Sequence, residues 1–191
     1  RSGVSATTQN QEETVARTSK KEVALQAALN IIERDGVPAL TYESLAEATG
    51  MSKSGLIYHF PSRHEMLIDI HAWSAQRWED ELISIAGAPA DALDAKHRLR
   101  AVILSLGKND PLVELILSIH TKSHPYFAQQ WAPVDNKWIP NASDPNLSPE
   151  MLELSLIANG LWVYDHISQR PLSASNRKLM VDSLLNRIAA V

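Results

Sequence analysis

The chain has 191 residues, 45% of them hydrophobic, which is enough to bury a core in one large domain or two smaller ones. It contains no cysteine, which excludes disulfides and cysteine-based zinc fingers, and no apolar run long enough to cross a membrane. The net charge is −4 and the pI is about 6.0, so nucleic-acid affinity through bulk charge is excluded and charge has to be considered locally. The opening residues lack the charged-then-apolar pattern of an export leader, and we expect a cytoplasmic protein.

The first helical segment follows a polar tail. Residues 1–17 are rich in Ser, Thr, Gln, Asn and Glu and cannot bury enough apolar surface to offset ordering, so a disordered tail is predicted there. Ala24, Ala28 and Ile31 then recur at helical spacing and mark the apolar face of a first helix, which is expected to end at Gly36.

Residues that begin and end helices recur along the rest of the chain, and no segment shows the sustained alternation of a strand. Thr41 is expected to cap a second helix that ends at Gly50, and Ser52 to cap a short third helix over 53–60. The remaining helices are predicted over 62–85, about 91–106, about 111–119, from 125 to a kink or end at Pro133, 149–167, and from 174 onward. The sequence thus predicts an all-α protein of about nine helices.

The two short helices around a glycine turn predict a helix-turn-helix over 41–60. Such a turn sets the helices at a wide angle, so that the second projects outward and can enter the major groove of DNA. Leu56, Ile57 and Phe60 are spaced to anchor the helix over 53–60 on the two preceding helices of the chain. The polar residues of this helix are then left to contact DNA. The residues expected at the DNA interface are Lys20, Lys21, Thr41, Ser52, Lys53, Ser54, Gly55, Tyr58, His59 and Arg63.

A long motif of constrained spacing contains this helix-turn-helix. It reads Thr41, Leu45-Ala46, Gly50-Met51-Ser52, Leu56-Ile57-Tyr58-His59-Phe60, Arg63 and Leu67. The motif resembles the TetR family of bacterial repressors, and the resemblance covers about residues 18–72. Arg63 stands where the family more often has lysine, although both residues can hold a phosphate. The segment 123–140 is also similar to multidrug-sensing members from actinobacteria.

Aromatic residues of the C-terminal half suggest an effector site. All five tryptophans lie outside the helix-turn-helix, and an aromatic pocket suits flat hydrophobic or cationic compounds. For any single tryptophan a place in the core is favoured, but at least two of the five are expected to line a cavity, Trp78 and Trp131 first. The resemblance implies a pocket flanked by the fourth and seventh helices, and the expected ligand-binding residues are Trp78, Leu82, Phe127, Trp131, Asn159 and Trp162. Asn159 could instead serve a dimer hydrogen bond.

The last two predicted helices suggest a homodimer. The helix over 149–167 is apolar nearly all round in its middle and therefore has to be covered on all sides, which in a short chain points to a partner subunit. The resemblance implies the same helix pair as a four-helix interface. The expected interface residues are Leu156, Val163, Met180, Leu184 and Ile188.

These observations predict three segments: a tail over 1–17, a helix-turn-helix DNA-binding domain over 18–64, and a ligand-binding and dimerisation domain over 65–191. A long helix is expected to join the last two. The predicted protein is a transcriptional regulator that binds a palindromic operator as a dimer. By the family default it is a repressor, released by a small hydrophobic, aromatic or cationic effector.

Two other classes of protein are weighed against this function. The sequence has no nucleophile-elbow, phosphate-loop or zinc-hydrolase motif, and we expect no catalytic activity and no cofactor. The histidine spacings match no metal motif, so no metal is expected. The second alternative is a helical small-molecule-binding protein without DNA binding, against which the outward Lys53, Tyr58, His59 and Arg63 argue.

Overall fold

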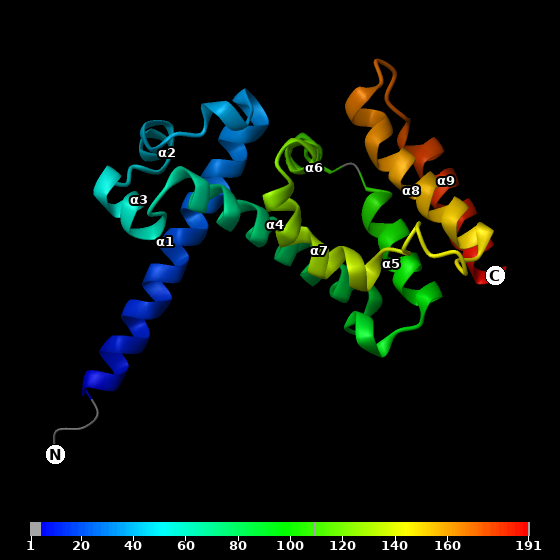
Figure 1. Ribbon diagram of the computed structural model, residues 1–191, viewed down its shortest axis with the longest axis horizontal. Coiled ribbons are helices and arrows are strands. Elements are labelled where there is room, and N and C mark those ends of the chain that lie inside the picture. Colours follow the sequence, from blue (N-terminus) through cyan, green and yellow to red (C-terminus); the bar gives the residue numbers. More distant parts are fainter. Residues whose placement is uncertain (1–4, 109, 191) are drawn as a thin grey trace. The chain divides into compact units, whose positions relative to one another are not determined.

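The computed structural model describes residues 5–108 and 110–190, with side chains described from Lys20 onward. Every regular element in this part of the chain is helical, which confirms the predicted all-α class (Figure 1). The elements are α1 Ser5–Asp35, η1 Val37–Ala39, α2 Tyr42–Thr49, α3 Lys53–His59, α4 Arg63–Ala86, η2 Ala90–Ala92, α5 Ala95–Leu106, α6 Leu112–Ser123, α7 Pro125–Trp138, α8 Pro149–Ile167 and α9 Ala174–Ala190. No helix in the described ranges combines the length and apolar character of a membrane span.

The chain divides into two compact units between Ile70 and His71, inside α4. The domain boundary expected after residue 64 lies in the same helix and stays a prediction. The structure also continues α1 back to Ser5, into the segment for which the composition predicts a disordered tail. Gln, Glu and Ala in that segment are good helix formers, which is consistent with the helical backbone.

The first unit is a small helical core. α1 packs on α2, and α2 packs on α3. The apolar face of α1 and side chains from each later element meet in this core, whose fully buried members include Ile32, Leu40, Leu45, Leu56, Phe60, Met66 and Ile70. Because α3 sends only Leu56 inward from its seven residues, most of its surface is left to solvent.

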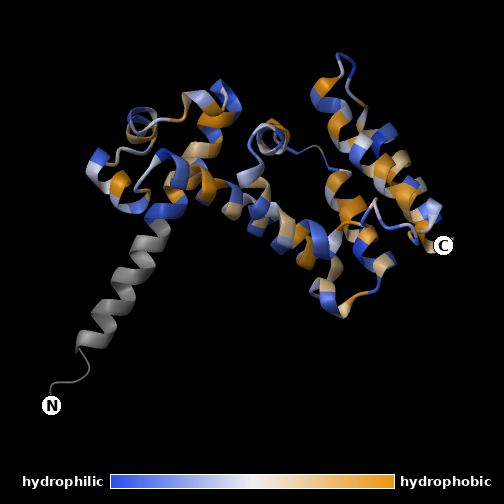
Figure 2. Ribbon diagram, viewed as in Figure 1, coloured by the Kyte–Doolittle hydropathy of each residue, from blue (hydrophilic) through white to orange (hydrophobic). Residues whose placement is uncertain are grey.

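The second unit is built around α5, which packs against α7, α8 and α9. Hydrophobic residues recur along α5 and α8 (Figure 2), and Leu99, Val102 and Ile103 of α5 are completely buried. Trp138, at the end of α7, is 1% exposed and joins the same core.

The boundaries of α5 and α6 differ from the sequence-based expectation, and of the two outcomes expected at Pro133, a kink or an end, α7 excludes the end. α6 continues to Ser123 instead of ending near residue 119. α5 begins at Ala95 rather than near Asp91, because residues 90–92 form the 3₁₀ turn η2 and Asp94 caps α5 by accepting from His97 N at 2.9 Å. α7 does not end at Pro133 but continues to Trp138. Proline removes one helical hydrogen bond, and burial of Trp138 in the core offsets this loss and stabilises the helix beyond Pro133.

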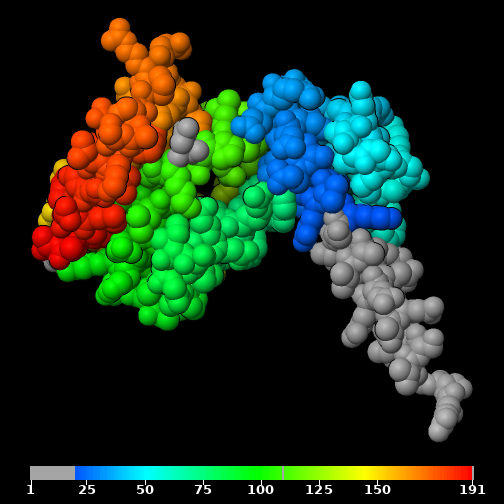
Figure 3. All heavy atoms as spheres, turned by 180° about the vertical axis from the view of Figure 1, so that it is seen from behind, coloured from blue at the N-terminus to red at the C-terminus, as the bar shows by residue number. Residues whose placement is uncertain are grey.

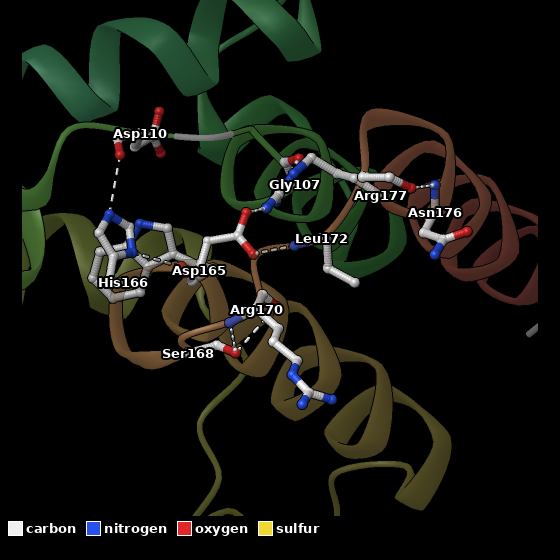
Figure 4. A network of polar contacts seen from close by, with 11 residues as sticks. Gly107, Asp110, Asp165, His166, Ser168, Arg170, Leu172, Asn176 and Arg177 are labelled. Atoms are coloured by element: carbon white, nitrogen blue, oxygen red, sulfur yellow. Dashed lines mark hydrogen bonds and ion pairs between the residues drawn. The ribbon is translucent and has the colours of Figure 1, made fainter.

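A polar network ties the ends of α8 and α9 to the C-terminus of α5 (Figure 4). Asp165 forms a buried ion pair with Arg177 and also accepts a hydrogen bond from Leu172 N, while Arg177 donates to Gly107 O. His166 faces two carbonyl oxygens, those of Trp162 at 2.9 Å and Asp110 at 3.0 Å. Both ring nitrogens can donate only when the imidazole is protonated.

Candidate DNA-binding surface and effector site

Local capping builds the helix-turn-helix as the sequence predicts. Thr41 caps α2 by accepting from Ser44 N at 3.0 Å, and Gly50 ends α2 in the left-handed conformation, at φ 68° and ψ 9°. Ser52 then caps α3 by accepting from Gly55 N at 3.1 Å. A side chain at Gly50 would be strained in this conformation, so the glycine fixes where the turn lies.

Three hydrogen bonds from two side chains to backbone carbonyls join the chain around the start of α2 to the chain around the end of α3. The Tyr42 hydroxyl donates to Phe60 O. Arg63, the first residue of α4, donates from Nε to Leu40 O and from a terminal nitrogen to Val37 O, both at 2.8 Å. The guanidinium that the sequence assigns to a phosphate thus already holds two carbonyl oxygens, and a phosphate contact by Arg63 stays a prediction.

The outward surface of α3 carries several of the expected DNA contacts. Lys53, Ser54 and Tyr58 are exposed, Tyr58 by 65%, and His59 is half-buried with its ring against the edge of Tyr58. The Lys53 ammonium pairs with Glu43 on α2 at 2.5 Å and holds the pKa of that carboxyl below its usual value. Since both partners are largely exposed, the pair is weak and Lys53 can exchange Glu43 for a phosphate.

The predicted anchoring role of Ile57 is wrong. Leu56 and Phe60 are completely buried, whereas Ile57 is 43% exposed. Leu56 and Phe60 stand four residues apart on one helical face, and Ile57 is turned about 100° away from Leu56. The prediction treated the three apolar residues as one buried face, although only Leu56 and Phe60 share a face of the helix.

The two lysines near the described start of α1 differ in their surroundings. Lys20 is exposed. Lys21 forms a salt bridge with Asp69 at 2.7 Å and lies over the Phe60 ring, 5.6 Å from its centre. Lys21 therefore helps hold α1 on α4, and its DNA contact remains a prediction.

The second unit brings histidines and aromatic residues together on α4, α6 and α7. His71 is completely buried, stacks on Phe127 with ring centres 5.0 Å apart, and accepts at Nδ1 from Trp131 Nε1 at 3.0 Å. The neutral ring therefore keeps its proton on Nε2 and donates it to His120 Nδ1, 3.1 Å away. Burial, and secondly the neighbouring His120, lowers the pKa of His71 to about 4.

The expected ligand-binding residues do not all join this cluster. Phe127 and Trp131 do. Trp78 donates to Ser105 Oγ at 3.0 Å, and Asn159 donates to Ser155 O of its own helix at 2.9 Å. The other two pack in or against the hydrophobic core, Leu82 as a fully buried member and Trp162 at its edge.

Two residues that were not among the expected ligand-binding residues lie in or next to the aromatic cluster. His71 contacts His120, Phe127 and Trp131 and is the centre of the cluster. Ser74, one helical turn further along α4, is 3% exposed, and its hydroxyl has no hydrogen-bond partner within the described residues. Its spacing from His71 could have suggested a shared face. The unpaired hydroxyl could not be foreseen.

The predicted dimer residues separate into two groups. Leu156 is 60% and Met180 41% exposed, and Val163 is half-buried. Leu184 and Ile188 are buried in the core of their own subunit, which leaves them little surface for a partner. Further exposed apolar residues lie on the same two helices, which are adjacent at the surface of the second unit (Figure 3): Tyr164, Ile167 and Leu179.

A group of three or more potential metal ligands does not occur among the residues that the structure describes.

The chain is similar to known proteins in its DNA-binding unit and in its fold. Residues 24–70 match the family model of the bacterial regulatory proteins of the tetR family. The nucleoid occlusion factor SlmA of Escherichia coli is 31% identical over 114 residues, which cover 58% of this chain and 56% of that protein. The chain thus spans little more than half the length of this relative.

Solved structures extend the similarity of fold over most of the chain. A transcriptional regulator from Saccharomonospora viridis in complex with choline aligns with a TM-score of 0.67 and 17% identity, over 88% of this chain and 96% of its own. A TetR-family regulator from Mesorhizobium loti aligns at 0.64 and 16%, over 91% and 96%. The multidrug binding protein EbrR with malachite green aligns at 0.60 and 16%, over 88% and 96%.

Proposed function

We propose that this chain, which belongs to the TetR family of bacterial regulatory proteins, is a cytoplasmic transcriptional regulator that represses by binding a near-palindromic operator as a homodimer. A hydrophobic, aromatic or cationic effector would release it from DNA. The observation that carries the proposal is the capped α2–α3 pair, whose second helix buries only Leu56 and exposes Lys53, Ser54 and Tyr58.

DNA binding would place α3 in the major groove, which admits an α-helix. Lys20, Lys53 and Tyr58 would contact phosphates or base edges, together with the hydroxyls of Ser52 and Ser54. Because the chain is acidic overall, this local arrangement has to supply the affinity. Breaking the Lys53–Glu43 pair would cost little beside a phosphate contact, since exposed pairs contribute at most about 1 kcal/mol.

A second copy of the chain would cover the exposed apolar residues of α8 and α9. Leu156, Tyr164, Ile167 and Leu179 are between 41% and 69% exposed, and apolar side chains gathered on two adjacent helices favour association. A symmetric dimer would present two α3 helices to operator half-sites roughly 34–36 Å apart.

The effector would bind beside the aromatic cluster of the second unit. His71 and Phe127 are buried and stacked on each other, so an effector would reach the cluster at the half-buried Trp131, whose ring is of the kind that attracts flat or cationic compounds. The unpaired Ser74 hydroxyl supports a bound polar group, because leaving it unsatisfied costs about 1–3 kcal/mol. The regulator solved with choline and the multidrug binding protein solved with malachite green support this effector class.

Footprinting on DNA from upstream of the gene and its neighbours tests the proposal. The protein should protect a near-palindrome, and hydrophobic cationic compounds should abolish the protection. Lys53→Ala should weaken operator binding and reduce the slope of log affinity against log salt by about 1 per half-site, or about 2 for the proposed dimer. Lys108→Ala is the matched control, because Lys108 also pairs with a glutamate at 2.5 Å but lies in the second unit.

Two results would decide against the proposal. A well-folded protein that retards no DNA even at low salt would favour the helical small-molecule-binding protein instead. An operator that no compound releases would keep the DNA-binding part and refute the effector.

A further inference from the structure

The recognition surface of α3 contains one large aliphatic side chain. Ile57 is 43% exposed, although the helix begins with Lys53 and Ser54 and exposes Tyr58 by 65%. Leu56, the neighbouring aliphatic residue, is completely buried. The surface that α3 turns outward is therefore polar except at Ile57.

An exposed isoleucine is not unusual by itself, since a folded protein leaves much apolar surface in water. Its position gives it significance. Lys53, one helical turn earlier, and Tyr58, the next residue, flank Ile57 among the proposed DNA contacts, so a helix that enters the major groove with them brings Ile57 to the base edges.

A branched aliphatic side chain distinguishes base pairs in one way only. It can neither donate nor accept a hydrogen bond, and the apolar group that the major groove offers is the C5-methyl of thymine. Against cytosine, the same side chain would meet a hydrogen in place of the methyl and would desolvate the N4 amino group. Against a purine it would cover the N7 acceptor, and a covered polar group without a partner is costly.

We propose that Ile57 reads one thymine in each operator half-site by packing against its C5-methyl group. This inference rests on the proposed DNA binding of α3 and adds a specificity-determining residue to it. Lys53, Tyr58, Ser52 and Ser54 would then fix the position of α3 on the DNA backbone. Ile57 would require a T·A pair at one position of each operator half-site.

Replacement of thymine by deoxyuridine tests this directly, because it removes the methyl and leaves base pairing and hydrogen-bonding groups unchanged. The operator found by footprinting is synthesised with deoxyuridine at one half-site thymine at a time, and equilibrium affinity is measured for each version. At one thymine the wild-type protein should bind about fourfold more weakly per half-site, which corresponds to the loss of one buried methyl group at about 0.8 kcal/mol. Ile57→Ala should bind the thymine and deoxyuridine operators equally.

Val23→Ala is the matched control. Val23 is 55% exposed, lies in the same unit and stands outside α3, so this variant should retain the full response to deoxyuridine. Ile57→Ala removes an exposed side chain, and circular dichroism and thermal unfolding should match the wild type.

The possible failures are distinguishable. A wild-type protein that binds its operator but responds to deoxyuridine at no position overturns the role of Ile57 and leaves DNA binding intact. A response that persists unchanged in Ile57→Ala assigns the methyl contact to another residue and equally overturns the inference. Absence of any DNA binding by the wild type overturns the proposed function and this inference together.

Discussion

Acidification should destabilise the second unit through His71. Burial lowers the pKa of His71 from 6.5 to about 4, so the folded unit holds this ring neutral. The unfolded chain takes up the proton as the pH falls below 6.5, whereas the folded unit does so only near 4. The contribution of His71 to stability is therefore complete above 6.5 and is lost as the pH falls from 6.5 toward 4. At about 1.4 kcal/mol per pKa unit, the loss amounts to about 3 kcal/mol.

Tryptophan fluorescence isolates the relevant unit, because all five tryptophans lie between Trp73 and Trp162. Chemical unfolding is followed from about pH 7.5 to about pH 4.5 for the wild type and for His71→Asn, which retains an acceptor for Trp131 but does not titrate. The wild type should lose stability steadily over this range relative to the variant. His97→Asn, which replaces an exposed histidine paired with Asp94, should keep the loss of stability that His71 causes.

Shifted pKa values of acidic side chains in the second unit act in both directions: hydrogen bonds from His97 lower the pKa of Asp94, which favours the unfolded state as the pH falls. Burial raises the pKa values of Asp110 and Asp135, so these groups favour the folded state as the pH falls. They are present in both proteins and cancel in the comparison. If His71→Asn lost stability on acidification as steeply as the wild type, the buried neutral His71 would not be the cause and the reasoning would be refuted.

Three further substitutions test other contacts. Arg177→Met breaks the buried ion pair of Figure 4 and should lower the free energy of unfolding by about 3–5 kcal/mol, whereas Lys178→Met, which breaks an exposed pair, should cost less than about 1 kcal/mol; equal losses would contradict the burial argument. Leu156→Glu should convert the proposed dimer to monomers in sedimentation, while Ile119→Glu, at an equally exposed position on α6, should leave it dimeric; monomeric wild-type protein would contradict the proposed interface. Arg63→Lys keeps the charge but cannot hold two carbonyls in a fixed fork, so both operator affinity and the thermal stability of the first unit should fall; loss of affinity alone would assign Arg63 to phosphate binding.

The features that the sequence predicted correctly depend on neighbours along the chain. Thr41 and Ser52 cap helices because each side chain reaches a backbone N–H three residues later. Gly50 ends α2 because it adopts a left-handed conformation. The start of α5 was misplaced because Asp91 and Asp94 are both acceptable near a helix start, and only packing decides that residues 90–92 form a separate turn.

The features that it missed depend on contacts between distant residues. Arg63 reaches carbonyls 23 and 26 residues away, and Trp131 reaches His71 across 60 residues, distances over which local patterns carry no information. The sequence indicated that Met180, Leu184 and Ile188 lie on one apolar face of α9, but it did not show whether the same chain or a second copy covers them. Leu184 and Ile188 are covered by their own subunit, and Met180 is left for another.

Helix α4 connects the two proposed activities without requiring the effector to approach α3. Arg63 lies on this helix in the first unit and His71 in the second. Within the first unit, Arg63 holds the segment that leads into α2 through Leu40 O and Val37 O.

The proposed release from DNA sets a minimum size for the effector. Moving the protein from mostly bound to mostly free requires about 5.5 kcal/mol of preference for the released form. Satisfying the Ser74 hydroxyl supplies about 1–3 kcal/mol. If a single effector provides the remainder by apolar burial at about 25 cal/mol per Å², it has to bury roughly 100–180 Å² more in the released form. That area is close to what one aromatic ring system buries, about 150–250 Å², so an effector of at least this size is required.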